Sequence, residues 1–330
     1  MPKLEVAKTY TIPAHEATAN GPNLKLVIEQ HSFPAKAPTT TTSTVNIIWS
    51  HANGFHKETL HPLMRRVAQQ LNKDYRNTNF EFYAWDGRNQ GDSARINEKH
   101  LPPTFSWQDH ALDIRQIVEV LKLKTSESQL IGIGHSVGAT STILCEFRYP
   151  GTFDAVFALE PILQIQVVPE ELRKNLPLLK SRKRRDTWDS FEDAYNFFST
   201  REFWKSWDPE ALDLYVKYGL YQDDNGKVRL KCLPEQEYAV YWYDYHAHHI
   251  AYQSLRAIQV PIHILFVTPS TVFPLNELKN FGRDAPTGSY SIVQGSHIVP
   301  LENPELISTE VLQFLKKVLV NTTTEVFAKL

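Results

Sequence analysis

The pentapeptide Gly-His-Ser-Val-Gly at residues 134–138 constrains the fold of this chain more than any other feature. An apolar run, "QLIGIG" (129–134), leads into it, and residues 137–148 follow with apolar side chains at helical spacing. A strand that turns directly into a helix leaves no room for side chains beside the turn, and glycine at both flanking positions removes them. We therefore expect Ser136 in a strained backbone conformation, with its hydroxyl raised above the carboxyl edge of a sheet at a helix N-terminus.

Segments with the spacing of strands and of helices alternate along most of the chain. Strands are expected at residues 3–12, 23–31, 45–50, 80–86, 129–134, 153–160, 260–267 and 288–294. Helices are expected at residues 57–72, 106–123, 137–148, 274–281 and 303–319. This alternation predicts an α/β fold, with a mostly parallel central sheet covered by helices on both faces.

The alternation stops between residues 161 and 258, where aromatic side chains are frequent and no strand is apparent. We interpret residues 161–258 as a helical lid or cap inserted into a core made of residues 1–160 and 259–330, and residues 321–330 as a flexible C-terminal tail. Substrate selection is expected in the insertion. Its aromatic residues predict either an apolar acyl pocket, with Trp204, Trp207 and Tyr245 as candidate substrate contacts, or ordinary packing.

Composition argues against several classes of function. The chain of 330 residues has a formal net charge of −2, which gives no electrostatic case for nucleic-acid binding. Its two cysteines do not make a disulfide framework. No secretory signal is apparent at the N-terminus, and no apolar stretch is long enough for a transmembrane helix, so neither is expected.

The pentapeptide and its flanking elements resemble the nucleophile turn of the α/β-hydrolases, and the resemblance continues in element order from residue 45 onward. It implies that Ser136 is the nucleophile. "HANGF" (51–55) resembles the family's loop after the third strand, which implies an oxyanion hole made by the backbone amides of Asn53 and Val137. "VQGSHIVPLENPE" places His297 between a strand and a helix, where the family carries its catalytic base.

The acid of the expected triad departs from the common pattern of this family. In most members it follows the strand that corresponds to residues 260–267, but "TPSTVFP" follows here and contains no carboxylate. Glu160 ends the preceding strand, as the acid does in some members, and an ionised carboxylate there can orient a histidine through its second ring nitrogen. We therefore predict Glu160 as the acid, with Glu277 and Asp284 as alternatives.

The resemblance implies a serine hydrolase that cleaves a carboxylic ester or thioester of a lipid-like acyl group through an acyl-enzyme, without a cofactor. The alternatives are a non-catalytic ligand-binding protein on the same fold and a cofactor-free perhydrolase. No metal is expected, because "HAHH" (246–249) lies among aromatic residues that favour packing. The basic run "KSRKRR" (180–185) predicts a solvated surface, with a nuclear-localisation-like patch or a phosphate contact for an acyl-CoA as alternatives.

The printed sequence ends in Ala328, Lys329 and Leu330, a variant of the Ser-Lys-Leu peroxisomal address. With the early acid, this tripeptide makes the chain resemble the fungal peroxisomal α/β-hydrolases, a group with a yeast lipase, hydrolases of toxin biosynthesis and mycophenolic-type acyl-CoA hydrolases. We therefore expect import into the peroxisomal matrix, with the cytoplasm as the alternative. The expected partners are a small acyl ester or acyl-CoA substrate and the peroxisomal import receptor.

Overall fold

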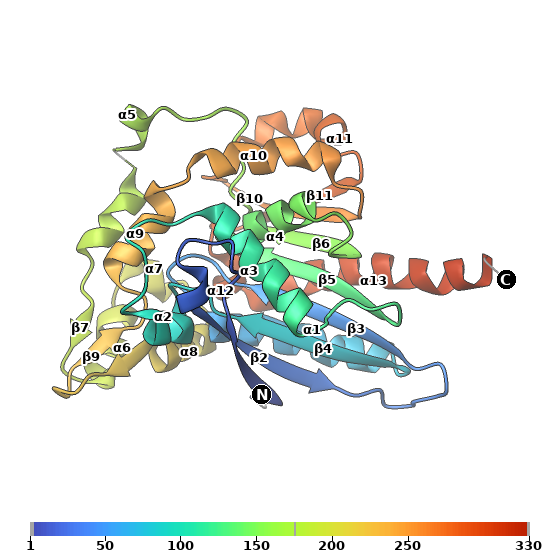
Figure 1. The fold of residues 1–330 in the computed structure, drawn as a ribbon, viewed down its shortest axis with the longest axis horizontal. Coiled ribbons are helices and arrows are strands. Elements are labelled where there is room, and N and C mark those ends of the chain that lie inside the picture. Colours follow the sequence, from blue (N-terminus) through green and yellow to red (C-terminus); the bar gives the residue numbers. More distant parts are fainter. Residues whose placement is uncertain (1–2, 175, 329–330) are drawn as a thin grey trace.

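The computed structural model describes residues 3–174 and 176–328, and Figure 1 shows their arrangement as a ribbon. Within these residues, the central sheet has eight strands in the order β1-β2-β4-β3-β5-β6-β10-β11. The strands are β1 (Lys8–Pro13), β2 (Lys25–Phe33), β3 (Ser43–Ser50), β4 (Thr78–Trp85), β5 (Ser128–His135), β6 (Ala155–Leu159), β10 (Ile262–Thr268) and β11 (Gly288–Gln294).

Most strands of the central sheet run parallel to their neighbours. β2 pairs antiparallel with both β1 and β4, and the other neighbouring strands from β4 to β11 pair in parallel. Parallel strands are buried on both faces, which explains why β6 is apolar and buried along its whole length. The mostly parallel sheet predicted from the sequence is confirmed.

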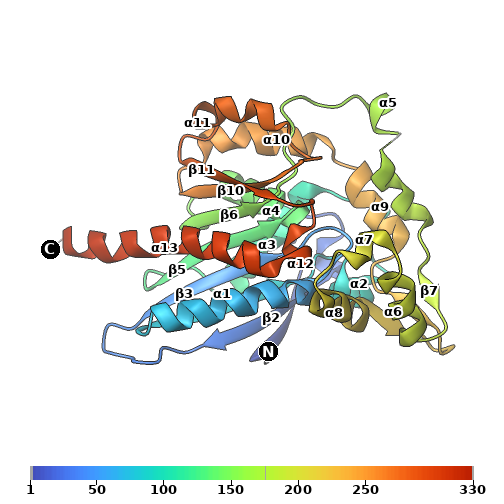
Figure 2. The same ribbon diagram turned by 180° about the vertical axis from the view of Figure 1, so that it is seen from behind.

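Helices cover both faces of this sheet, as Figures 1 and 2 show from opposite sides. One face carries α1 (His61–Asp74) and α13 (Pro304–Ala328), which pack into one apolar cluster with the inner faces of the strands. The other face carries α3 (Trp107–Val120), α4 (Val137–Arg148) and α10 (His246–Ser254), which share a second cluster. The shorter helices α2 (Gly91–Asn97), α11 (Phe281–Asp284) and α12 (Val299–Glu302) lie in the connections.

The inserted segment is not purely helical, so this part of the sequence-based expectation is wrong. Its described residues include a small sheet of three strands in the order β7-β9-β8. Its elements are α5 (Glu170–Arg173), β7 (Thr187–Trp188), α6 (Phe191–Ser199), α7 (Glu202–Lys205), α8 (Pro209–Gly219), β8 (Leu220–Gln222), β9 (Val228–Leu230) and α9 (Pro234–Trp242). Strands of two or three residues are too short to show the alternation that identifies a strand in a sequence.

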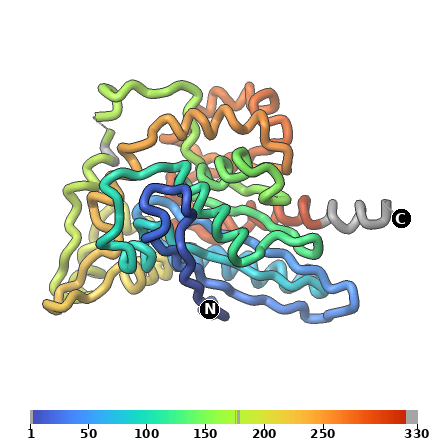
Figure 3. The backbone as a smooth tube through the Cα atoms, in the orientation of Figure 1, coloured from blue at the N-terminus to red at the C-terminus, as the bar shows by residue number. Residues whose placement is uncertain are grey.

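The insertion lies over the carboxyl ends of the central strands, and Figure 3 follows the chain out to it and back. Its apolar core includes Ala52 and Phe55 from the loop after β3, and Ile298 and Leu301 from the segment after β11. The last helix within residues 161–258, α10, instead packs against α4 and belongs to the layer over the sheet. The insertion therefore contacts the loops that follow two strands of the central sheet.

The described backbone continues as α13 as far as Ala328, into the segment at residues 321–330 for which a flexible tail is expected. The flexibility of this segment stays a prediction. Lys329 and Leu330, two residues of the predicted targeting tripeptide, lie outside the described residues. Among the helices that are described, none has both the length and the apolar character to cross a membrane.

Candidate active site

Ser136 lies in the turn between β5 and α4, at φ 55° and ψ −117°. A Cβ atom at Gly138 would lie 2.3 Å from the carbonyl oxygen of Ser50, and a Cβ atom at Gly134 would lie 2.5 Å from the backbone nitrogen of Ala139. Both distances are shorter than carbon can approach backbone atoms, so the turn requires glycine on both sides. This is the steric reason that the sequence predicts for the two glycines.

His297 lies between β11 and α12 and connects the other two residues of the predicted triad. Its Nε2 is 2.9 Å from Ser136 Oγ, and its Nδ1 is 3.2 Å from Glu160 Oε2. A carboxylate only accepts hydrogen bonds, so Nδ1 carries the proton and Nε2 accepts from the serine hydroxyl. The three residues, far apart in the sequence, therefore form one chain of hydrogen bonds.

Glu160 follows β6 and is held rigidly beside the histidine. Its side chain is 1% exposed, and its Oε1 accepts from the backbone N–H of Val267 at 2.7 Å, which leaves Oε2 for His297. Its φ is 44°, so both Ser136 and Glu160 occupy the left-handed region that side chains disfavour. Strained backbone of this kind concentrates at functional sites, where the surrounding structure must maintain it.

The two alternative acids are engaged elsewhere in the structure. Asp284 pairs with Arg256 at 2.9 Å and with a second arginine next to it in the sequence. Glu277 accepts a hydrogen bond from Asn280 Nδ2 at 3.0 Å. The geometry therefore favours Glu160 as the partner of the histidine.

His135, the residue before Ser136, holds the loop that carries His297. Its Nε2 donates to the backbone oxygen of His297 at 2.8 Å, and the two imidazole rings lie 5.3 Å apart. Burial lowers the pKa of His135 to about 3, so its ring is neutral at physiological pH and places no charge beside His297. Nothing in the pentapeptide pattern indicates this role, because the position between glycine and serine accepts many residue types.

The loop after β3 carries the first of the two predicted oxyanion amides. The side chain of Asn53 donates from Nδ2 to the Glu237 carbonyl at 3.0 Å and accepts from Gln90 Nε2 at 2.9 Å. Gln90 Oε1 in turn accepts from the backbone N–H of Gly54 at 3.1 Å. Among the described residues, the backbone N–H groups of Asn53 and Val137 have no protein acceptor, so both are available to a negative oxygen.

A buried cluster of charges supports the same loop from the side of β4. Lys57, the first residue of a short 3-10 helix (Lys57–Leu60), places its Nζ 2.7 Å from Glu58, 3.1 Å from Asp86 and 2.7 Å from Asp92. Burial acts to lower the pKa of Lys57, but these carboxylates raise it well above its ordinary value, so the ammonium is charged. The backbone N–H of Lys57 also donates to Asp86 at 2.8 Å, which ties the loop to the turn after β4.

Trp204 and Trp207, two candidate substrate contacts, lie in the packed core of the insertion. They are 9% and 4% exposed, and the Trp207 ring lies 5.2 Å from that of Phe55. Ile298, next to His297 in sequence, belongs to the same apolar cluster. For these two tryptophans the structure favours ordinary packing over a pocket wall, and the packing joins the insertion to the loops beside the triad.

Tyr245, the third candidate, lies at the start of α10. Its hydroxyl accepts from Gln164 Nε2 at 2.5 Å, and the guanidinium of Arg173 lies 4.4 Å from its ring centroid. Of the neighbouring histidines, His248 packs edge-on against the ring of Trp107 at 4.3 Å. These contacts are structural, and no described group of potential metal ligands includes the 246–249 segment.

The basic run at residues 180–185 is only partly the solvated surface that the sequence predicts. Arg182 and Arg185 are exposed. Arg184 turns inward, forms an ion pair with Glu237 on α9, and donates to the hydroxyl of Tyr215 at 3.0 Å. For Arg184 the expectation of a solvated surface is therefore wrong, because its charge is matched inside the insertion.

Comparison with known proteins gives matches to hydrolases. A family model described as serine aminopeptidase, S33, matches residues 61–203. The type I acyl-CoA thioesterase mpaH of Penicillium roqueforti is 24% identical over 202 residues, which are 59% of this chain and 44% of the relative. This chain therefore spans less than half of that thioesterase.

Two further matches cover most of the chain. The peroxisomal membrane protein LPX1 of Saccharomyces cerevisiae is 24% identical over 293 residues, 81% of this chain and 74% of the relative. A solved structure described as the peroxisomal alpha-beta-hydrolase Lpx1 from the same yeast superposes with a TM-score of 0.81 at 18% identity, covering 97% of this chain and 91% of that one.

Proposed function

We propose that this chain, an α/β-hydrolase by its fold and its relatives, cleaves a carboxylic ester or thioester of a lipid-like acyl substrate with Ser136 as nucleophile. The observation that carries the proposal is the continuous path of hydrogen bonds from Ser136 Oγ through His297 to Glu160. The strained backbone at both ends of this path supports it, because such strain persists only where the fold enforces it.

In the proposed reaction, His297 accepts the hydroxyl proton as Ser136 Oγ attacks the acyl carbonyl. The carbonyl oxygen becomes negative and is stabilised by the N–H groups of Asn53 and Val137. Glu160 stabilises the imidazolium, which then protonates the departing alcohol or thiol and leaves the acyl group on Ser136. A water molecule, deprotonated by His297, hydrolyses this acyl-enzyme, and the proton returns to Ser136 Oγ.

Both oxygen esters and thioesters fit this scheme, because each passes through the same tetrahedral intermediate. The similarity to mpaH, which is described as an acyl-CoA thioesterase, supports a thioester substrate. The similarity to a solved structure described as a thermophilic esterase supports an oxygen ester. The substrate contacts of this chain are proposed to lie where the insertion meets the loops after β3 and β11.

A substrate panel tests this proposal. The purified full chain is assayed with p-nitrophenyl esters and with acyl-CoAs from acetyl to palmitoyl, beside labelling with a fluorophosphonate probe. We expect labelling at Ser136, located by peptide mass spectrometry, and turnover of at least one of the two series, faster for long acyl chains than for acetyl. Absence of both labelling and turnover contradicts the proposal, and binding of acyl compounds without turnover would identify a non-catalytic binder.

We propose the peroxisomal matrix as the location of this protein, through Ala328, Lys329 and Leu330. Two observations support this: the tripeptide resembles an address that the peroxisomal import receptor reads, and the yeast relative is described as peroxisomal. In fungal cells, the N-terminally tagged chain is expected to coincide with a peroxisomal marker. Removal of residues 328–330 is expected to release it to the cytosol, whereas the matched change Asn321→Gln leaves it in place. An unchanged distribution after the deletion contradicts the proposed address.

A further inference from the structure

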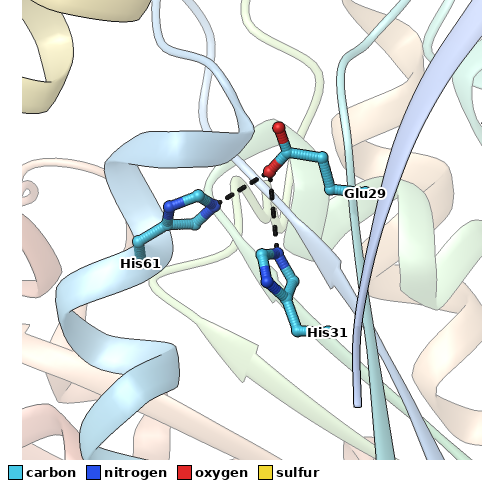
Figure 4. A group of neighbouring side chains, drawn as sticks. All are labelled: Glu29, His31 and His61. Atoms are coloured by element: carbon cyan, nitrogen blue, oxygen red, sulfur yellow. Dashed lines mark hydrogen bonds and ion pairs between the residues drawn. The ribbon is translucent and has the colours of Figure 1, made fainter. Parts of the chain in front are cut away.

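Three potential metal ligands converge between β2 and α1, in a part of the molecule that the proposed reaction does not use (Figure 4). Glu29 Oε2 lies 3.1 Å from His61 Nε2 and 3.6 Å from His31 Nε2. Glu29 and His31 are two residues apart on β2 and so share one face of the strand, while His61 opens α1. The three residues are buried, and their ligand atoms lie within 4.8 Å of one another.

His31 has a buried ring nitrogen without a hydrogen-bond partner. Its Nδ1 lies 2.6 Å from the backbone oxygen of Glu5, which only accepts, so Nδ1 carries the proton. The lone pair of Nε2 in the neutral ring then faces the carboxylate oxygen of Glu29, and two acceptors meet in a largely buried site. A cation between these atoms removes the conflict, because both lone pairs become ligands.

We propose that Glu29, His31 and His61 bind a divalent transition metal of the zinc type and thereby fasten β2 to the start of α1. Two imidazoles and one carboxylate are a common ligand set for zinc, whereas magnesium prefers oxygen ligands alone. Ligand atoms around a tetrahedral zinc ion are roughly 3.3 Å apart, given bonds of about 2.0–2.1 Å. The two distances from Glu29 Oε2, 3.1 and 3.6 Å, bracket that spacing.

Lys57 is the nearby positive charge that would oppose a cation here, but it faces the other oxygen of the carboxylate. Its Nζ lies 3.8 Å from Glu29 Oε1 and makes shorter contacts, of 3.1 Å or less, with Glu58, Asp86 and Asp92. Glu29 Oε2 therefore remains free for the two imidazoles, as the dashed lines of Figure 4 show. Sequence patterns do not reveal this cluster, because His31 and His61 are not close enough in the chain to form a recognisable metal-binding motif.

Direct metal binding to the full chain tests the proposal. The protein is stripped with EDTA, and zinc sulfate is added in a calorimeter, with cobalt as a spectroscopic probe of tetrahedral coordination. We expect one equivalent of zinc, visible cobalt absorption, and a higher melting temperature with zinc than with EDTA. His31→Gln and His61→Gln are each expected to weaken zinc binding at least about tenfold.

The double variant His246→Gln/His249→Gln is the matched control, since it removes as many histidines from the "HAHH" segment. It is expected to keep the affinity of the wild type. Glu29→Gln, which preserves size, replaces either histidine variant if near-ultraviolet circular dichroism shows that variant to be unfolded. Absence of zinc binding by the wild type, or loss of binding in the control alone, overturns the proposal. A wild type that binds no metal would identify the cluster as a hydrogen-bonded group.

Discussion

Ser136→Ala is expected to lower kcat on the best ester or thioester by on the order of 10⁴-fold or more and to abolish fluorophosphonate labelling. The reason is that Ser136 Oγ is the only atom in the proposed scheme that forms the covalent acyl-enzyme, so no other group in the triad can replace it. Alanine keeps the backbone and loses one buried hydroxyl, so the melting temperature is expected to stay close to that of the wild type. The measurements are kcat from steady-state kinetics and the extent of fluorophosphonate labelling, both on the folded variant.

Substitutions of His297 and Glu160, the proposed partners of Ser136, test the same mechanism independently. His297→Ala is expected to reduce kcat about as much as Ser136→Ala, and the double variant to be no worse than either, because the residues act as a unit. Glu160→Gln keeps the acceptor for Val267 but removes the charge that stabilises the imidazolium, so a reduction of about 10²- to 10⁴-fold is expected. Glu277→Gln is the control and is expected to retain activity.

One outcome would reassign the acid. If Glu160→Gln keeps full activity while Glu277→Gln or Asp284→Asn loses it, the contact at 3.2 Å between Glu160 and His297 is not the functional one. Each rate is compared per folded protein, since Asp284 also forms ion pairs with two arginines, whose loss could affect stability.

The proposed triad could be located in the sequence because each of its members follows an element with a clear local pattern. Ser136 ends a run of apolar residues between two obligatory glycines, Glu160 ends a fully buried strand, and His297 follows the last strand. Parallel strands bring their carboxyl ends to one edge of a sheet, so these residues meet whatever the details of packing. The local sequence pattern places each residue at the end of a strand, and the parallel sheet brings these strand ends close together.

The insertion was harder to predict, because its structure depends on contacts rather than on periodicity. β8 and β9 have three residues each, although the Asn225-Gly226 pair between them is a hairpin signal that the sequence does contain. The sequence alone does not tell whether Trp204 and Trp207 line a pocket, since aromatic residues have the same spacing in a packed core and in the wall of a pocket. Arg184 lies in a run of basic residues and is distinguished only by the ion pair it makes.

The buried lysine near the oxyanion loop is a further feature that the sequence does not reveal, because a single lysine after a strand usually lies on the surface. Lys57 is 0% exposed, and carboxylates of Glu58, Asp86 and Asp92 surround its Nζ. Lys57 and His56 lower the pKa of Glu58 to about 2 against the opposing effect of burial, so Glu58 is ionised at neutral pH. Lys57 therefore supplies one positive charge to all three carboxylates, and Lys231 forms a further ion pair with Asp92 at 2.5 Å.

Lys57→Met is expected to lower the free energy of unfolding by about 3–5 kcal/mol, measured from the urea midpoint, because it fills the same space and leaves buried carboxylates without their cation. Adding Glu58→Gln removes one of those charges, so the double variant is expected to be less destabilised than the sum of the single changes. Lys227→Met is the matched control: its partner Asp189 is exposed, and the change is expected to leave the urea midpoint close to that of the wild type. If Lys57→Met is as stable as this control, the prediction is wrong. The negative charges of the carboxylates would then be neutralised by protons or stabilised by water instead of by Lys57. The same variant should also lower kcat in proportion to any loosening of the loop that carries Asn53, since the Lys57 side chain contacts Asp86 at 3.1 Å in the turn after β4.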